Sequence, residues 1–152
     1  MYTEHFLNAA EEFFHDINLP LVGVEESQSI NNLYELTGSL GITGSIRGYL
    51  VLQSEMLTAH NLVMGMAMRL GVSFDELDFG PFHRATIGEI ANQIAGKAIM
   101  KLETCGISCT ITPPTIFIGK GISMTLPSSS CVLERTLIGN FGMLHFFVGL
   151  TE

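Results

Sequence analysis

The sequence predicts an α+β fold, in which about three helices form one layer on a second layer that is a mainly antiparallel sheet. Helical periodicity appears in three segments, and the strand-like segments come in consecutive runs, which favours antiparallel pairing. No linker or low-complexity stretch divides the chain. Its 152 residues, 47% of them hydrophobic, can bury one sizeable core, so we expect a single domain over residues 1–152.

The first helix is expected at the N-terminus, with Thr3 as a candidate N-cap and Pro20 beyond its end. Its apolar positions recur at helical spacing and are Phe6, Ala10, Phe13, Phe14 and Ile17. A second helix is expected over residues 55–70, with Gly71 as its C-cap. A third is expected over about 82–105, ended by Gly106, and its apolar side consists of Ile90, Ala91, Ile94, Ala98 and Leu102.

Strand-like segments occupy two parts of the chain. The first group lies near residues 21–28, 32–42 and 45–54, with a hairpin turn at 43–45. The second group lies near residues 107–111, 115–119, 121–127, 130–138 and 141–150. Turn signals at Gly119-Lys120-Gly121 and at Gly139-Asn140 predict hairpins in this second group.

Charge and composition exclude several classes of function. The net charge is −8 and the seven Lys and Arg residues are scattered, which argues against nucleic acid and anionic membranes as partners. No apolar run reaches the roughly 18 residues that cross a bilayer, and the N-terminus lacks a basic signal-peptide region, so we expect a cytoplasmic protein. The three cysteines and five histidines show no zinc or redox spacing, so no metal site is predicted.

A polar pair interrupts the third helix, within the stretch "GEIANQIAG". Glu89 and Asn92 are three residues apart and therefore share a helix face, and Gly96 lies one turn beyond Asn92. Spacing alone favours ordinary explanations: a capping box between Thr86 and Glu89, a solvated amide at Asn92, and a close helix–sheet contact at Gly96. The alternative is a functional face, which Gly96 would leave flat for the approach of another backbone.

A resemblance to a known family favours the functional alternative. Three stretches of the sequence resemble the CheX branch of the CheC/CheX/FliY chemotaxis phosphatases. They are "GEIANQIAGKA", then "ITPPTIFIGKG" with its "PPT" at 113–115, and the G-x-L-V-L strand at 48–52. The family's E-x-x-N signature and the small pair after it are matched by Glu89, Asn92, Ala95 and Gly96. CheC-type members commonly carry two such helices. Here the second helix has Asn61 but Thr58 in place of the glutamate, so one copy remains, as in the CheX branch.

The resemblance implies a CheC/CheX-like fold and a phosphatase acting on the phospho-aspartate of a CheY-like response regulator. Glu89 and Asn92 would be its catalytic residues: Asn92 would hold the attacking water, and Glu89 would engage a lysine of the receiver. It implies no cofactor of the protein's own, Mg²⁺ supplied by the phosphorylated receiver, and a homodimer. Two other functions remain open, a receiver-binding adaptor module without catalysis and a structural subunit without partner chemistry.

Overall fold

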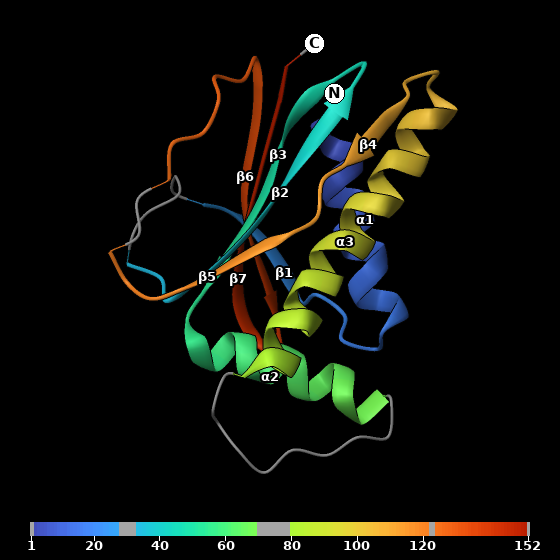
Figure 1. Ribbon diagram of the computed structural model, residues 1–152. Coiled ribbons are helices and arrows are strands. Elements are labelled where there is room, and N and C mark those ends of the chain that lie inside the picture. Colours follow the sequence, from blue (N-terminus) through green and yellow to red (C-terminus); the bar gives the residue numbers. More distant parts are fainter. Residues whose placement is uncertain (1, 28–32, 70–79, 122–123, 152) are drawn as a thin grey trace.

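The computed structural model describes residues 2–27, 33–69, 80–121 and 124–151, and these contain three helices and seven strands. The helices are α1 (Thr3–Asp16), α2 (Met56–Arg69) and α3 (Pro81–Thr104). The strands are β1 (Gly23–Glu26), β2 (Leu36–Gly44), β3 (Arg47–Ser54), β4 (Cys109–Ile111), β5 (Thr115–Ile118), β6 (Cys131–Gly139) and β7 (Gly142–Thr151). The predicted α+β architecture is confirmed (Figure 1).

All seven strands belong to one antiparallel sheet, in the order β1-β6-β7-β3-β2, with both β4 and β5 pairing along the outer side of β2. The connection between β4 and β5 stays attached to β2 at Thr112. Its N–H donates to the Gly41 carbonyl at 2.9 Å, and its hydroxyl accepts from the Gly41 N–H at 2.7 Å. Strands β4 and β5 therefore form one edge of the sheet, interrupted at the Pro113-Pro114 pair.

Helices α1 and α3 lie side by side on one face of the sheet, and α2 lies across one end of it (Figure 1). The core fills the space between these layers. The predicted apolar stripe of α1 is confirmed, because all five of its residues are buried. The largest fully buried side chains come from both layers and include Phe6, Phe13, Phe14, Leu50, Leu52, Ile90, Ile94 and Phe146.

The order of elements contains two units of the form helix, edge strand, hairpin. The first unit is α1, β1 and the β2–β3 hairpin, and the second is α3, β4–β5 and the β6–β7 hairpin. The edge strand of each unit pairs with the hairpin of the other, and β3 pairs with β7 at the centre. Helices α1 and α3 each lie near one edge of the sheet, which gives the fold two analogous helix–edge surfaces.

Three local predictions differ from the structure. Thr3 is the first residue of α1 and is buried, while the N-cap position is Tyr2, so Thr3 is no cap. The predicted strand at 121–127 is wrong for residues 124–127, which form no strand, and residues 122–123 lie outside the described part. The hairpin expected at Gly119–Gly121 is consequently wrong, because β5 pairs with β2 instead. The Gly71 C-cap lies outside the described residues.

The β2–β3 and β6–β7 hairpins are confirmed, with connecting residues 45–46 and 140–141, one or two positions later than the turns expected at 43–45 and Gly139-Asn140. Gly44 has a φ of +122°, and an added Cβ there would lie 2.6 Å from the Ser108 carbonyl oxygen. A glycine is therefore required where this hairpin meets the start of β4. Among the helices that the structure describes, none is both long and apolar enough to span a bilayer.

Candidate active site

The helix that carries the polar pair begins well before it. Helix α3 starts at Pro81, a residue type suited to the first helical position, and Gly80 is its N-cap. The Thr86 hydroxyl donates to the Phe82 carbonyl at 2.9 Å, so Thr86 lies inside the helix. The start at or before Arg84 is confirmed, and the capping-box explanation of Glu89 is wrong because Glu89 lies in the third turn.

The opposite side of α3 anchors the helix to the sheet. The residues predicted to pack there are each at most 1% exposed and are Ile90, Ala91, Ile94, Ala98 and Leu102. Gly88 permits a further close contact, because an added Cβ would lie 3.2 Å from Cγ of Pro114. Pro114 follows β4 and precedes β5, so this contact places the sheet edge against the helix one residue before Glu89.

Glu89 and Asn92 lie on the accessible side of α3, Glu89 exposed and Asn92 half-buried. Oε1 of Glu89 accepts a hydrogen bond from Nε2 of Gln93 at 3.1 Å, one helical turn away. Within the described residues, the Asn92 carboxamide has no hydrogen bond to a side chain or to the backbone outside its helix. Its donor and acceptor are therefore free to bind water or a ligand.

The pair borders a shallow depression between α3 and strand β5, with a volume of about 370 Å³. The residues that line it are Arg84, Ala85, Gly88, Glu89, Asn92, Pro114 and Ile116. The sequence identified Glu89 and Asn92 but missed Arg84, Pro114 and Ile116. The "PPT" segment was the signal for the opposite wall, but only the pairing of β5 with β2 brings it beside Glu89.

Gly96 has no structural role in close packing. An added Cβ would meet no atom of the described residues within 4 Å, so the close helix–sheet contact considered for Gly96 is wrong, and Gly88 makes that contact instead. Glycine inside a helix costs about 1 kcal/mol relative to alanine. No packing contact with the described residues compensates for that cost, so the approach of a partner's backbone stays a prediction for this flat position.

Asn61 of α2 is used differently from Asn92. Its Nδ2 donates to the Phe141 carbonyl at 3.2 Å, which ties α2 to the turn between β6 and β7. Thr58, three residues earlier, is buried, and an added Cβ at Gly142 would lie 2.7 Å from its hydroxyl. This helix therefore uses the corresponding positions for packing, which agrees with a single E-x-x-N site.

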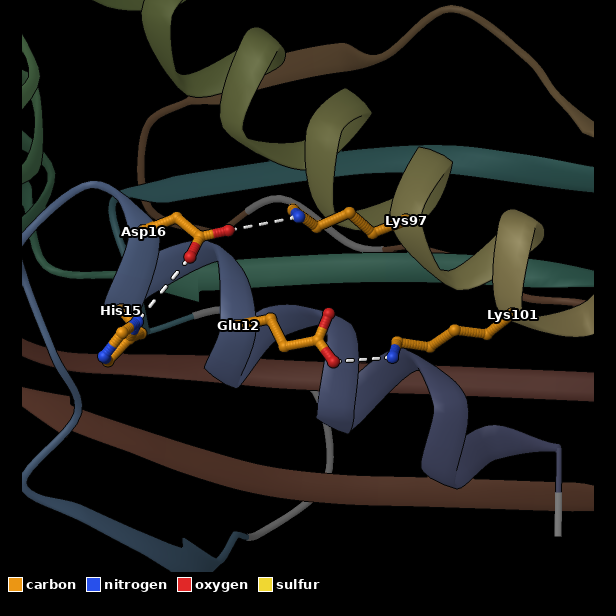
Figure 2. A network of polar contacts seen from close by, with 5 residues as sticks. All are labelled: Glu12, His15, Asp16, Lys97 and Lys101. Atoms are coloured by element: carbon orange, nitrogen blue, oxygen red, sulfur yellow. Dashed lines mark hydrogen bonds and ion pairs between the residues drawn. The ribbon is translucent and has the colours of Figure 1, made fainter.

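Ion pairs hold the C-terminal half of α3 to α1 (Figure 2). Nζ of Lys97 lies 3.3 Å from a carboxylate oxygen of Asp16, and Nζ of Lys101 lies 2.6 Å from one of Glu12. The hydrogen bond from Lys97, and then that from His15, lowers the pKa of Asp16 below its ordinary value. Near the N-terminal end of α3, burial lowers the pKa of His83, with a smaller contribution from His60, which favours neutral imidazole there.

No group of three His, Cys, Asp or Glu side chains in the described part of the chain is placed to hold a metal ion. Cys105, Cys109 and Cys131 are all free thiols. The depression is lined by the Glu89 carboxylate, the Asn92 carboxamide and the Arg84 guanidinium, together with small and apolar residues. Such a set can bind and orient a substrate or a water molecule by hydrogen bonding.

Comparison with known proteins shows to which family the chain belongs. The family model described as "Chemotaxis phosphatase CheX" matches residues 36–136, which is well over half of the sequence and includes both walls of the depression. The chain belongs to the CheX family. A curated relative, the CheY-P phosphatase CheX of Thermotoga maritima, is 37% identical over 103 residues. That match covers 63% of this chain and 64% of the relative, so the matched region is less than two thirds of the relative's length.

Solved structures of CheX proteins share the fold over nearly the whole chain. The CheX structure from Desulfovibrio desulfuricans has a TM-score of 0.79 and 19% identity, with 98% of each chain covered. A complex of CheX with CheY, BeF₃ and Mg²⁺ from Borrelia burgdorferi has a TM-score of 0.77 and 22% identity, with 100% of this chain and 99% of that chain covered. At these identities the likeness concerns the fold, which is the CheC/CheX-like α+β fold expected from the sequence.

Proposed function

We propose that this CheX-family protein is a phosphatase that accelerates hydrolysis of the phospho-aspartate of a CheY-like response regulator. The observation that carries the proposal is the Asn92 carboxamide, which is accessible and unbonded beside Glu89 in the depression of α3. The Thermotoga maritima relative is named for this activity, and the Borrelia burgdorferi complex contains CheX together with CheY.

The reaction places few demands on the protein's own side chains. Water attacks phosphorus, the bond between phosphorus and the aspartyl oxygen breaks, and the products are inorganic phosphate and a free carboxylate. The acyl oxygen is already a good leaving group, so the remaining requirement is a water held in line with it. A carboxamide can orient that water without adding negative charge beside an anion, and we assign this role to Asn92.

Glu89 has a different role in the proposal. A carboxylate next to a phosphoryl group would repel it, so Glu89 contacts a cation of the receiver, such as a lysine, and anchors α3 across the receiver's phosphorylation site. The hydrogen bond from Gln93 orients the Glu89 carboxylate on the exposed face and leaves its other oxygen available for that contact. The Mg²⁺ that neutralises the phosphoryl oxygens is supplied by the receiver.

The proposal is tested by following a phosphorylated receiver domain in Mg²⁺ with and without a substoichiometric amount of this protein. We expect faster loss of the phosphoryl group and many turnovers per protein molecule. The second candidate, a receiver-binding adaptor, predicts binding with decay at the receiver's own rate. That outcome would support the adaptor function in place of the phosphatase. The absence of both binding and turnover would support the structural-subunit hypothesis.

We further propose that the protein is a homodimer, paired through an exposed sheet edge into one continuous sheet. Edge strands need protection from unwanted pairing. The β1 edge is the better candidate, because Val22 just before it and Val24 within it are 72% and 38% exposed, whereas the β4–β5 edge contains two prolines and borders the proposed site. Light scattering should give the mass of two chains at micromolar concentration, and a monomer throughout would remove this proposal.

A further inference from the structure

Arg84 differs from the other cations of α3. The helix carries three: Arg84, Lys97 and Lys101. Lys97 and Lys101 are paired with carboxylates of α1 (Figure 2). The guanidinium of Arg84 is exposed, lines the depression with Glu89 and Asn92, and has no hydrogen bond or ion pair to any residue that the structure describes. Its charge is therefore available at the site.

The position of Arg84 does not serve the stability of the helix. Arg84 lies in the first turn of α3, which contains no acidic residue, and the N-cap provides no side-chain hydrogen bond. The positive end of the helix dipole disfavours a cation at this position and would favour a carboxylate. Arg84 adds positive charge to a helix start that is already electropositive, in a chain whose net charge is −8.

The analogous helix–edge surface of the first unit has the opposite character. The depression between α1 and β1 is lined by the carboxylates of Glu11, Glu12 and Asp16. Two of these carboxylates, Glu12 and Asp16, are paired with lysines of α3, but no Lys or Arg lines this depression to attract an anionic partner. The depression at α3 has one cation and one carboxylate among its lining residues, so it is the surface on which an anionic partner is tolerated.

The phosphorylated receiver, which is the substrate of the proposed reaction, is anionic at the phosphoryl group and also at the groups around it. A phospho-aspartate carries the phosphoryl charges, and a Mg²⁺ bound with a phosphoryl group is held by carboxylates. Arg84 precedes Asn92 by eight residues, which is about 12 Å along a helix. When Asn92 holds the attacking water, the Arg84 side chain would lie away from that water and could contact groups around the reacting phosphorus.

We propose that Arg84 is the docking residue of this site, whose guanidinium binds anionic oxygens of the phosphorylated receiver beside its phosphorylation site. This inference rests on the proposed function and adds to it the group that sets affinity and encounter rate. Arginine suits the role, because its fork of N–H donors matches the geometry of carboxylate and phosphoryl oxygens. Arg84 acts on the bound ground state, so its loss changes KM and leaves the chemical step intact.

The test compares Arg84→Glu with Arg47→Glu, which makes the same charge change at another exposed cation. Arg47 is the first residue of β3, directly after the β2–β3 hairpin. In that hairpin the Ser45 N–H donates to the carbonyl of Ser108, which follows the C-terminal end of α3, whereas Arg84 lies at the N-terminal end. We expect Arg84→Glu to raise KM at least about tenfold, to leave kcat within about twofold and to flatten the salt dependence of kcat/KM. Arg47→Glu should leave KM within about twofold of the parent, since its charge lies far from the docking surface.

Three further measurements make the result decisive. Arg84→Lys should restore part of the affinity, and the melting temperature of Arg84→Glu should not fall, because a carboxylate suits the first turn. Affinity for the receiver with and without BeF₃ identifies the source of the anionic oxygens. Loss only with BeF₃ points to phosphoryl oxygens, and loss in both forms points to fixed carboxylates.

The inference is overturned if Arg84→Glu raises KM no more than Arg47→Glu does. A parent protein that fails to accelerate dephosphorylation overturns the proposed function instead. In that case the comparison of receiver affinities still tests Arg84, so the two failures can be told apart.

Discussion

Asn92→Ala is expected to abolish receiver dephosphorylation while leaving the complex with the receiver largely intact. The carboxamide contributes in the transition state, by holding water in line with phosphorus, so its removal falls on the chemical step. We expect a loss of roughly a hundredfold or more in the single-turnover rate, since positional errors of about 1 Å can cost that much. The measurement is loss of phosphate from a saturating complex, beside affinity for a BeF₃-bound receiver.

Glu89→Ala is the paired variant that separates the two roles. Its carboxylate contacts the receiver in the ground state too, so its removal should weaken binding as well as turnover. Neither variant should change the melting temperature much, because both side chains lie on the accessible side of α3 and the helix begins eight residues before Glu89. If Asn92→Ala binds weakly but hydrolyses normally at saturation, the water-positioning role is wrong. If both variants hydrolyse like the parent, the pair is not the active site.

The layer architecture could be predicted because local patterns determine it. The buried faces of α1 and α3 follow the 3.6-residue period, and the two hairpin turns carry glycines at the required positions. The segment at 121–127 has apolar residues typical of a strand, but strand assignment depends on a partner strand. The partner expected for this segment was the strand at 115–119, which pairs with β2 instead, and the described residues 124–127 form no strand.

For a similar reason, only the part of the candidate site that lies on one helix could be predicted from the sequence. Glu89 and Asn92 lie three apart on one helix, so their common face follows from spacing. Pro114 and Ile116 enter the site through the pairing of β5 with β2, a contact between distant parts of the chain. The two interior glycines of α3 have the same local signal but different surroundings. Gly88 faces Pro114, and Gly96 faces open space, which only the packed structure distinguishes.

Ile94→Asp should destabilise the protein more than any substitution on the exposed face of α3. Ile94 is 0% exposed at the centre of the helix side that packs on the sheet, one turn from Ile90 and Ala98. The change removes buried apolar contacts and places an unpaired carboxylate where water cannot solvate it. We expect a loss of about 3–5 kcal/mol in the free energy of unfolding, visible as a fall of roughly 10 °C or more in melting temperature.

Met100→Asp is the matched control for this prediction. It introduces the same side chain six residues further along the same helix, at a position that is 67% exposed. A surface change of this kind should alter the free energy of unfolding by no more than about 0.5 kcal/mol, including the small cost of a negative charge near the C-terminal end of a helix. Equal thermal shifts for the two variants would mean that α3 is rotated relative to the sheet. The accessible face assigned to Glu89 and Asn92 would then be wrong as well, because the buried and exposed sides of one helix are fixed together by its period.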